Sequence, residues 1–255
     1  MPDRECALFV KASPTAFSVV PETNYLGHRT LDWVRSRLDS KLFSRSGWFL
    51  QQFIKIEAAR HGASHDATLI WDADTIPLKP LEFIDEAGRF IHYTGQFLHP
   101  PHFEGAASLL EVAAHPPHCF IGQSFAATGA MFNAFCKRAE AVHGVHWIEA
   151  LIALLNRKPH VSFSEYDYLG YFLISQYPDT LAYSTGRWEQ YGKSLFGGIE
   201  GLNPASIAYA ARFIDFASFE TWDHGLKYNR NILKRPRKTW MAYKIRHLNR
   251  VSTKA

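Results

Sequence analysis

Asp72 and Asp74 are the residues whose type and spacing most directly suggest chemistry, because they follow the apolar run 67–71 (Ala-Thr-Leu-Ile-Trp). On an extended backbone, side chains at i and i+2 project to the same side, about 7 Å apart. At an effective dielectric of about 20, their repulsion is on the order of 2–3 kcal/mol. Mn²⁺ or Mg²⁺ would relieve it, since both ions bind carboxylates and commonly keep phosphate oxygens as further ligands. The pair therefore predicts a metal site that neutralises a leaving diphosphate.

Two other interpretations of the same residues stay open. An Asp-x-Asp pair can lie in an ordinary turn with both carboxylates in water. An apolar strand followed by Asp-x-Asp-x-Thr, here Asp72 to Thr75, is also how phosphatases of the haloacid dehalogenase type present a nucleophile and a general acid. Those enzymes place the motif on their first strand and need a later acidic pair, and no Asp-Asp follows here. This phosphatase is the second choice.

The elements around the pair indicate an α/β protein. Apolar residues at helical spacing predict an amphipathic helix over 49–58, ended by Gly62, and 67–71 is a continuous apolar strand. Ligands of open α/β sheets bind at the carboxyl ends of strands, which is where the pair lies. We further expect strands at 7–10, 16–20 and 213–219, helices at 131–142, 147–155 and 166–177 (the last capped by Ser164), a short strand or loop at 161–164, a loop over 96–118, and a partly helical tail from 228.

Two longer motifs carry a resemblance. Gly47-Trp48-Phe49-Leu50-Gln51-Gln52-Phe53-Ile54-Lys55 precedes Asp72-Ala73-Asp74-Thr75, and Ser162-Phe163-Ser164-Glu165-Tyr166 follows later. With these motifs the chain resembles a family of bacterial proteins of unknown function that look like GT-A glycosyltransferases. The resemblance spans roughly residues 5–225. It implies a Rossmann-like mixed sheet flanked by helices, a nucleotide-sugar donor, and a glycan or glycolipid acceptor.

The resemblance also implies roles for individual residues. Asp72 and Asp74 would hold the metal, with Asp72 also near the donor ribose, and His224 would complete the metal shell, with Asp223 as its rival. Glu165 would be the general base for the acceptor hydroxyl; the alternative is a first-turn glutamate that stabilises its helix through the dipole. The remaining candidates are Gln51 and Lys55 for the donor, and His99, His102, Trp147 and Tyr166 for the acceptor.

One departure from the GT-A pattern concerns the N-terminus. Residues 7–24 match the second and third pieces of the nucleotide-binding half, so the first strand–helix unit is expected to be missing. A catalytically silent sugar- or nucleotide-binding relative is therefore a further alternative to the transferase. We expect residues 1–225 to form the transferase domain and 226–255 a basic tail.

Composition and charge set the remaining limits. The 255 residues include three cysteines, an odd number without metal-ligand spacing, which fits a reducing compartment. We see no signal peptide and no membrane span, so we expect a cytoplasmic location. Ten Lys and Arg and no acid lie from His224 onward, whereas the preceding residues carry a net charge of −6. Trp240, Met241, Ile245 and Leu248 would form an apolar stripe that either touches an anionic membrane or packs on the domain; the acidic body argues against nucleic acid.

Overall fold

The computed structural model describes residues 2–62, 65–95, 97–112, 118–158 and 160–252. The chain divides into two compact units, and it combines many helices with small mixed sheets. The first unit comprises the chain up to Ile70, Gly95–Ile121 and Ala126–Leu181; the second comprises Trp71–Thr94, Gly122–Phe125 and Ala182 onward. The protein is therefore of the mixed α/β class.

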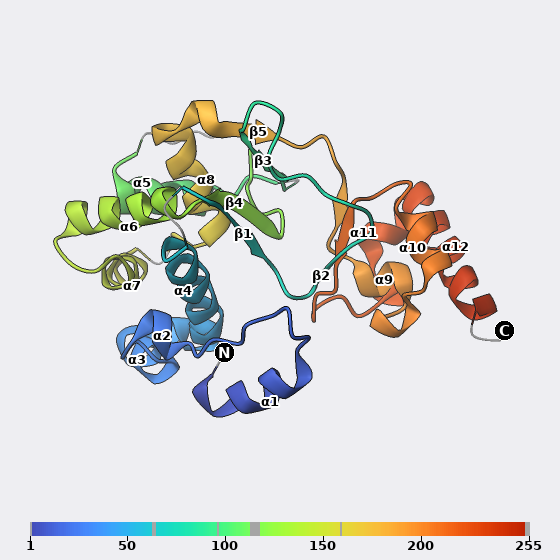
Figure 1. Ribbon diagram of the computed structural model, residues 1–255, viewed down its shortest axis with the longest axis horizontal. Helices are drawn as coiled ribbons and strands as arrows, with labels where there is room; N and C mark the ends of the chain where they lie inside the picture. The colour runs from blue at the N-terminus through green and yellow to red at the C-terminus, as the bar shows by residue number, and fades with distance from the viewer. Residues whose placement is uncertain (1, 63–64, 96, 113–117, 159, 253–255) are drawn as a thin grey trace. The chain divides into compact units, whose positions relative to one another are not determined.

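Helices form most of the first unit (Figure 1). α7 shows why: Trp147, Ile148, Leu151 and Leu155 are fully or almost fully buried, on the apolar side of an amphipathic helix. The helices of this unit are α1 (Cys6–Ala12), α2 (Thr23–Leu26), α3 (Leu31–Arg37), α4 (Ser46–Arg60), α5 (Pro100–Leu110), α6 (Gly129–His143), α7 (Trp147–Arg157) and α8 (Glu165–Gln176), with short 3₁₀ turns at Asp3–Glu5, Ser40–Arg45 and Pro178–Thr180.

Two glycines allow close packing around α8. A Cβ on Gly105 of α5 would lie 1.7 Å from the hydroxyl oxygen of Tyr168, and one on Gly170 would lie 2.2 Å from the ring of Phe120. Neither distance is possible for a real side chain, so both positions need glycine for steric reasons. The α5–α8 contact holds the segment that carries Glu165 in place.

Short strands and later helices build the second unit. Its three-stranded sheet has the order β2 (Thr75–Pro77), β7 (Phe216–Ser218), β6 (Trp188–Glu189), with β2 antiparallel and β6 parallel to β7. Two further strand pairs are β1 (Ala67–Trp71) with β4 (Ser124–Thr128), most of whose residues belong to the first unit, and β3 (Phe90–His92) with β5 (Leu181–Tyr183). The helices are α9 (Gly192–Phe196), α10 (Pro204–Ala210), α11 (Arg230–Leu233) and α12 (Pro236–Ser252), with 3₁₀ turns at Ile199–Gly201 and Leu226–Tyr228.

Most of the expected elements are confirmed. The helix over 49–58 is the centre of α4, the strand 67–71 is β1, and α6, α7 and α8 cover the three later helices. The expected strand 213–219 is confirmed only at Phe216–Ser218. Residues 161–164 form no regular element, and Ser164 does precede α8, although its side chain makes no capping hydrogen bond.

Three expectations about secondary structure are wrong. Residues 7–10 belong to helix α1, and 16–20 form no strand, because a short apolar run does not by itself distinguish helix from strand. The expected loop over 96–118 contains helix α5, which begins at Pro100, where the missing N–H of proline has no intrahelical partner to lose. Residues 96 and 113–117 of that expected loop lie outside the described residues.

The C-terminal helix α12 packs inside the second unit. Met241, Ala242 and Ile245 are buried beside α9 and α10, which confirms that the expected stripe is at least partly internal. Trp240 of the same stripe is 60% exposed. None of the described helices has the length and apolarity needed to cross a bilayer.

Candidate functional site

The Asp72–Asp74 pair lies in a tight turn that follows β1. The Thr75 amide donates a hydrogen bond to the Asp72 carbonyl at 3.0 Å, which closes a four-residue turn. The extended backbone expected at the pair is therefore wrong. The apolar strand before it is confirmed as β1 but is only partly buried, since Leu69 is 44% exposed. Asp74 is exposed and Asp72 half-buried, so both carboxylates are open to a ligand from solvent.

Hydrogen bonds fix this turn on the second unit. The Asp72 amide donates to the Gln123 carbonyl at 3.1 Å, and the Phe219 amide donates to the Asp74 carbonyl at 2.8 Å. The indole N–H of Trp71 donates to the Thr75 carbonyl at 2.9 Å. The backbone beneath the two carboxylates is thus held on both sides, and their side chains are presented on a fixed frame.

Glu220 adds a third carboxylate that the sequence did not reveal. Burial and the charges of Asp74 and Asp72 together raise its pKa, which places the three acids in one electrostatic group. The side-chain amide of Gln123 donates to Glu220 Oε1 at 3.1 Å and partly opposes this rise. We refer to Asp72, Asp74 and Glu220 as the acidic cluster.

Gln123 connects the members of the acidic cluster. Its carbonyl accepts the Asp72 amide while its side chain donates to Glu220. Its backbone has φ 60°, in the left-handed region that residues other than glycine rarely adopt. Such backbone strain persists only where the surroundings enforce it, and it concentrates at functional sites.

The chemistry of this donor set fits a hard divalent cation. Carboxylate oxygens are the ligands that Mn²⁺ and Mg²⁺ prefer, and a cation would relieve the repulsion that, after burial, contributes to the raised pKa of Glu220. Across the described ranges, however, no three His, Cys, Asp or Glu side chains already lie close enough to hold a metal. A bound ion would therefore need other ligands, and phosphate oxygens and waters are suitable.

His224, the proposed additional metal ligand, is exposed and lines a pocket of about 260 Å³ together with Tyr191, Trp222 and Arg230. Its rival Asp223 is buried and structural: it accepts hydrogen bonds from the Ser194 amide at 2.7 Å, the Ser194 hydroxyl at 2.5 Å and the Gly225 amide at 3.1 Å. These bonds leave Asp223 little capacity for a metal. Ligation by His224 stays a prediction.

In the first unit, the structure brings together Lys55, Glu165 and Tyr166. Lys55 Nζ lies 2.7 Å from Glu165 Oε1 and 3.4 Å from the Tyr166 hydroxyl. The Glu165 side chain is 4% exposed. Gln51 faces solvent, whereas its neighbour Gln52 is buried and accepts a hydrogen bond from the Glu165 amide at 2.9 Å. Gln52 is thus a positioning residue that helical spacing from Lys55 did not single out.

His102 and His99, both expected to line the acceptor pocket, differ in environment. His102 is buried, and its Nδ1 lies 2.6 Å from Asp167, a fully buried carboxylate that also accepts the Phe120 amide at 2.7 Å. His99 is exposed, with its ring centroid 5.0 Å from that of His102. The contact with Asp167 gives His102 a structural partner, and an acceptor role for either histidine stays a prediction.

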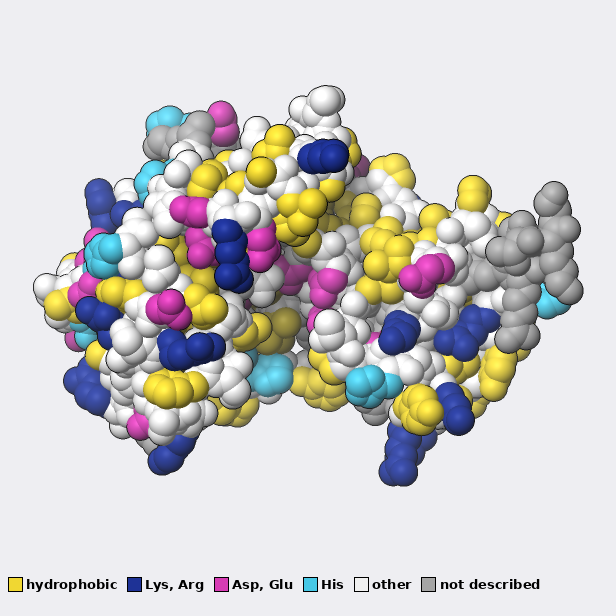
Figure 2. All heavy atoms as spheres, turned by 90° about the horizontal axis from the view of Figure 1, so that it is seen from below, with side chains coloured by type: hydrophobic (Ala, Val, Ile, Leu, Met, Phe, Trp, Pro, Cys, Tyr) yellow, Lys and Arg dark blue, Asp and Glu magenta, His cyan; other side chains and the backbone are white. Residues whose placement is uncertain are grey.

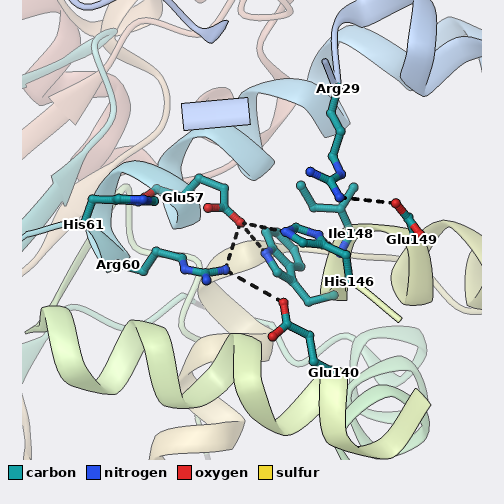
Figure 3. Close-up of polar contacts among 9 residues, drawn as sticks. Arg29, Glu57, Arg60, His61, Glu140, His146, Ile148 and Glu149 are labelled. Carbon is teal, nitrogen blue, oxygen red and sulfur yellow. Dashed lines mark hydrogen bonds and ion pairs between the residues drawn. The ribbon is translucent and has the colours of Figure 1, made fainter. Parts of the chain in front are cut away.

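Trp147 does not line a site, which corrects the expectation that it contacts the acceptor. It is fully buried, with its ring edge-on to Phe53 and Phe135, so neither face can stack on a sugar. Its indole N–H donates to Glu57 Oε1 at 2.5 Å. Figure 3 shows Arg60 and His146 reaching toward the same carboxylate, at 3.1 and 3.7 Å. Trp147 belongs to this structural network.

Taken together, the fold and the acidic cluster define a mixed α/β protein with a carboxylate site on its second unit. The chain belongs to a sequence family described as "Family of unknown function (DUF6492)", whose pattern matches residues 2–195. The match includes Asp72 and Asp74 and ends before Glu220. No curated protein and no solved structure matches the chain.

Proposed function

We propose that this protein is a metal-dependent glycosyltransferase, which moves a sugar from a nucleotide-sugar donor to a glycan or glycolipid acceptor. In this proposal the acidic cluster holds Mn²⁺ or Mg²⁺, and the ion also binds the diphosphate of the donor. The metal neutralises the charge that develops on the leaving nucleoside diphosphate. The GT-A fold that the resemblance implies is part of the same proposal.

The observation that carries the proposal is the grouping of Glu220 with Asp72 and Asp74, which hydrogen bonds of Gln123 and Phe219 hold in place. Burial raises the pKa of Glu220 most, and the charges of Asp74 and Asp72 raise it further, which marks a place with an excess of negative charge. Such places concentrate at functional sites. The strained backbone of Gln123, which contacts both sides of the acidic cluster, supports the same conclusion.

The residues of the first unit contribute less to this proposal. The roles that the resemblance implies for Glu165 as general base, and for Lys55 and Gln51 as donor contacts, stay predictions. The ion pair of Lys55 and Glu165 is compatible with a catalytic pair and equally with a structural one. The first test therefore addresses the acidic cluster.

Titration calorimetry with a panel of nucleoside diphosphates, with and without Mn²⁺, tests the proposal. We expect binding that requires Mn²⁺ and becomes at least about tenfold weaker in Asp74→Asn, because one charge-assisted metal ligand is lost. Glu86→Gln is the matched control, since Glu86 is an exposed acid of the same unit outside the cluster. Metal-independent binding, or equal binding by Asp74→Asn, would contradict the proposal.

A second assay separates the alternatives once binding is known. Release of nucleoside diphosphate from a nucleotide sugar supports the transferase. Hydrolysis of an aryl phosphate that depends on Asp72 would indicate the phosphatase instead. Binding without turnover of any nucleotide sugar would indicate a silent relative.

A further inference from the structure

The second unit carries a groove of about 530 Å³ that is independent of the acidic cluster. It lies between the start of α12 and the segment after α10. Ile214 and Met241 form a buried apolar floor, only 3% and 6% exposed. Phe213 and Trp240 stand at its edge, 42% and 60% exposed. The groove therefore offers apolar surface that water can reach. We call it the C-terminal groove.

Aromatic rings cluster around this groove. The ring centroid of Tyr209 lies 5.4 Å from that of Phe213 and 6.2 Å from that of Trp240. The Arg212 guanidinium lies 5.7 Å from the Phe213 ring. Tyr209 is partly buried, so Trp240 and Phe213 are the rings that reach solvent. Exposed Trp rings next to cationic side chains are typical of protein surfaces at the membrane–water interface, where one end of the ring is apolar and the other is hydrated.

The charge of the side chains around the C-terminal groove indicates which kind of partner it can bind. Arg187 and Arg237 are exposed and line the groove, whereas Lys238 forms an ion pair with Glu189. From His224 onward the chain has ten Lys and Arg and no acid. Figure 2 shows basic and hydrophobic side chains next to one another on the surface that the C-terminal helices form. The partner must therefore be anionic as well as apolar.

We propose that the C-terminal groove docks this protein on an anionic membrane. An acyl chain of a phospholipid lies on Phe213, Ile214 and Met241, Trp240 enters the interface, and Arg187 and Arg237 contact the lipid phosphate. Basic residues near an anionic leaflet and an apolar surface that inserts between lipids reinforce each other. Nucleic acid fits less well, because the groove has an apolar floor and the preceding chain is acidic.

Deleting the tail is the wrong test of this surface. Met241, Ala242 and Ile245 are part of the core of the second unit, so removal of α12 would expose that core. Point substitutions at exposed positions avoid the problem. Trp240→Gln removes the interfacial ring, and the double variant Arg187→Glu/Arg237→Glu reverses two charges at the groove.

The chain provides a matched control for each change. Tyr228 is 67% exposed, and Lys227 Nζ lies 5.4 Å from its ring, so this pair also combines a cation with an exposed aromatic side chain. Neither residue lines the C-terminal groove. Tyr228→Gln therefore controls for loss of an exposed ring, and Lys227→Glu controls for a general change in charge.

Co-sedimentation with vesicles of phosphatidylcholine, alone or mixed with phosphatidylglycerol, tests the proposal. We expect the wild type to bind only the anionic vesicles, with an affinity that falls as salt rises. The arginine double variant should bind at least about tenfold more weakly, given several-fold per charge. Trp240→Gln should also bind more weakly, by about five- to tenfold. The vesicle affinity of both controls should stay within about twofold of that of the wild type. Thermal unfolding checks that every variant is folded. If the arginine variant does not fold, the vesicle affinity of Trp240→Gln decides the test.

Several results would overturn this docking surface. Sedimentation of the wild type with neither vesicle would do so, as would an equal loss of binding in Lys227→Glu and the arginine variant, which would indicate unspecific attraction. Displacement from anionic vesicles by an equal mass of unstructured RNA would identify nucleic acid as the better partner. Because these measurements need no nucleotide or metal, their outcome is separate from that of the transferase assays.

Discussion

Two acidic centres in this protein differ in how their charge is balanced. In the first unit, Glu57 is 4% exposed and receives Arg60 at 3.1 Å and the Trp147 indole at 2.5 Å, with His146 at 3.7 Å (Figure 3). In the second unit, Glu220 shares its surroundings with Asp72 and Asp74, and burial together with the charges of these two residues raises its pKa. In the first centre, hydrogen-bond donors surround the single carboxylate of Glu57. The second centre, the acidic cluster, consists of carboxylates.

The difference separates a structural use of acidic residues from a functional one. A buried carboxylate surrounded by donors holds helices together, and its loss leaves those donors buried and unsatisfied. Carboxylates that repel one another stabilise nothing by themselves, so their grouping calls for a cation or a proton. Substitutions at the two centres should therefore affect different properties, activity at the acidic cluster and stability at Glu57.

Asp72→Ala/Asp74→Ala should abolish turnover without unfolding the protein. If the acidic cluster holds the catalytic metal, loss of two of its carboxylates should lower kcat/KM by about a thousandfold or more, equivalent to about 4 kcal/mol. Asp74 is exposed and Asp72 half-buried, so the free energy of unfolding should stay within about 1 kcal/mol of the wild type. Steady-state kinetics and urea denaturation measure the two effects. Unfolding without a specific loss of activity would assign the pair a structural role.

Glu57→Ala should show the opposite pattern. Removing a buried carboxylate that binds Arg60 and Trp147 should lower the free energy of unfolding by about 3 kcal/mol or more. Nucleoside diphosphate affinity, measured where the variant is still folded, should be unchanged. The matched control is Glu149→Ala, which removes the partner of Arg29 at a 39% exposed position and should lose less than about 1 kcal/mol. Equal losses at both positions would show that the Glu57 network adds nothing beyond a surface ion pair.

The sequence predicted elements and residue pairs that are close along the chain, but not the contacts between distant segments. Periodicity located α4, β1, α6, α7 and α8, and spacing singled out Asp72 and Asp74, because these patterns depend on neighbours along the chain. Glu220 and Gln123 reach the pair only through β7 and β4, and no local pattern indicates that contact. Only the turn-like Gly122–Gln123 step before β4 could have hinted at a special backbone there.

Residue type alone was a poor guide to which side chains belong to a site. Trp147 fits a sugar-binding surface by its type, yet its position on the apolar side of α7 places it in the core. Gln51 and Gln52 are adjacent and chemically identical, and only the orientation of α4 decides that Gln52 faces Glu165. Helical spacing relates residues within one element, whereas the face that an element buries depends on its tertiary partners.

His92 should make the stability of the second unit depend on pH. It is 2% exposed beside Phe125, and burial lowers its pKa from 6.5 to about 4. Because the unfolded chain binds a proton that the folded chain excludes, this stability is fully present above pH 6.5 and is lost as pH falls toward about 4. The loss should approach about 3 kcal/mol as an upper bound. Denaturation at pH 6.5 and at pH 4 measures this loss. The free energy of unfolding of the wild type, relative to that of His92→Leu, should fall by that amount at the lower pH, and an unchanged relative stability would contradict the prediction.

Glu220→Gln should have the smallest effect on stability and should decide what the acidic cluster is for. The raised pKa means that folding disfavours the ionised carboxylate, so the wild type gains stability as pH falls through that pKa, and the variant should not. At pH 7 the variant should be as stable as the wild type or more stable, by less than about 1 kcal/mol after solvent screening. Mn²⁺ should raise the Tm of the wild type more than that of the variant, because the ion relieves a repulsion that the variant lacks. A less stable variant with an unchanged response to Mn²⁺ would instead make Glu220 a structural acceptor for the amide of Gln123.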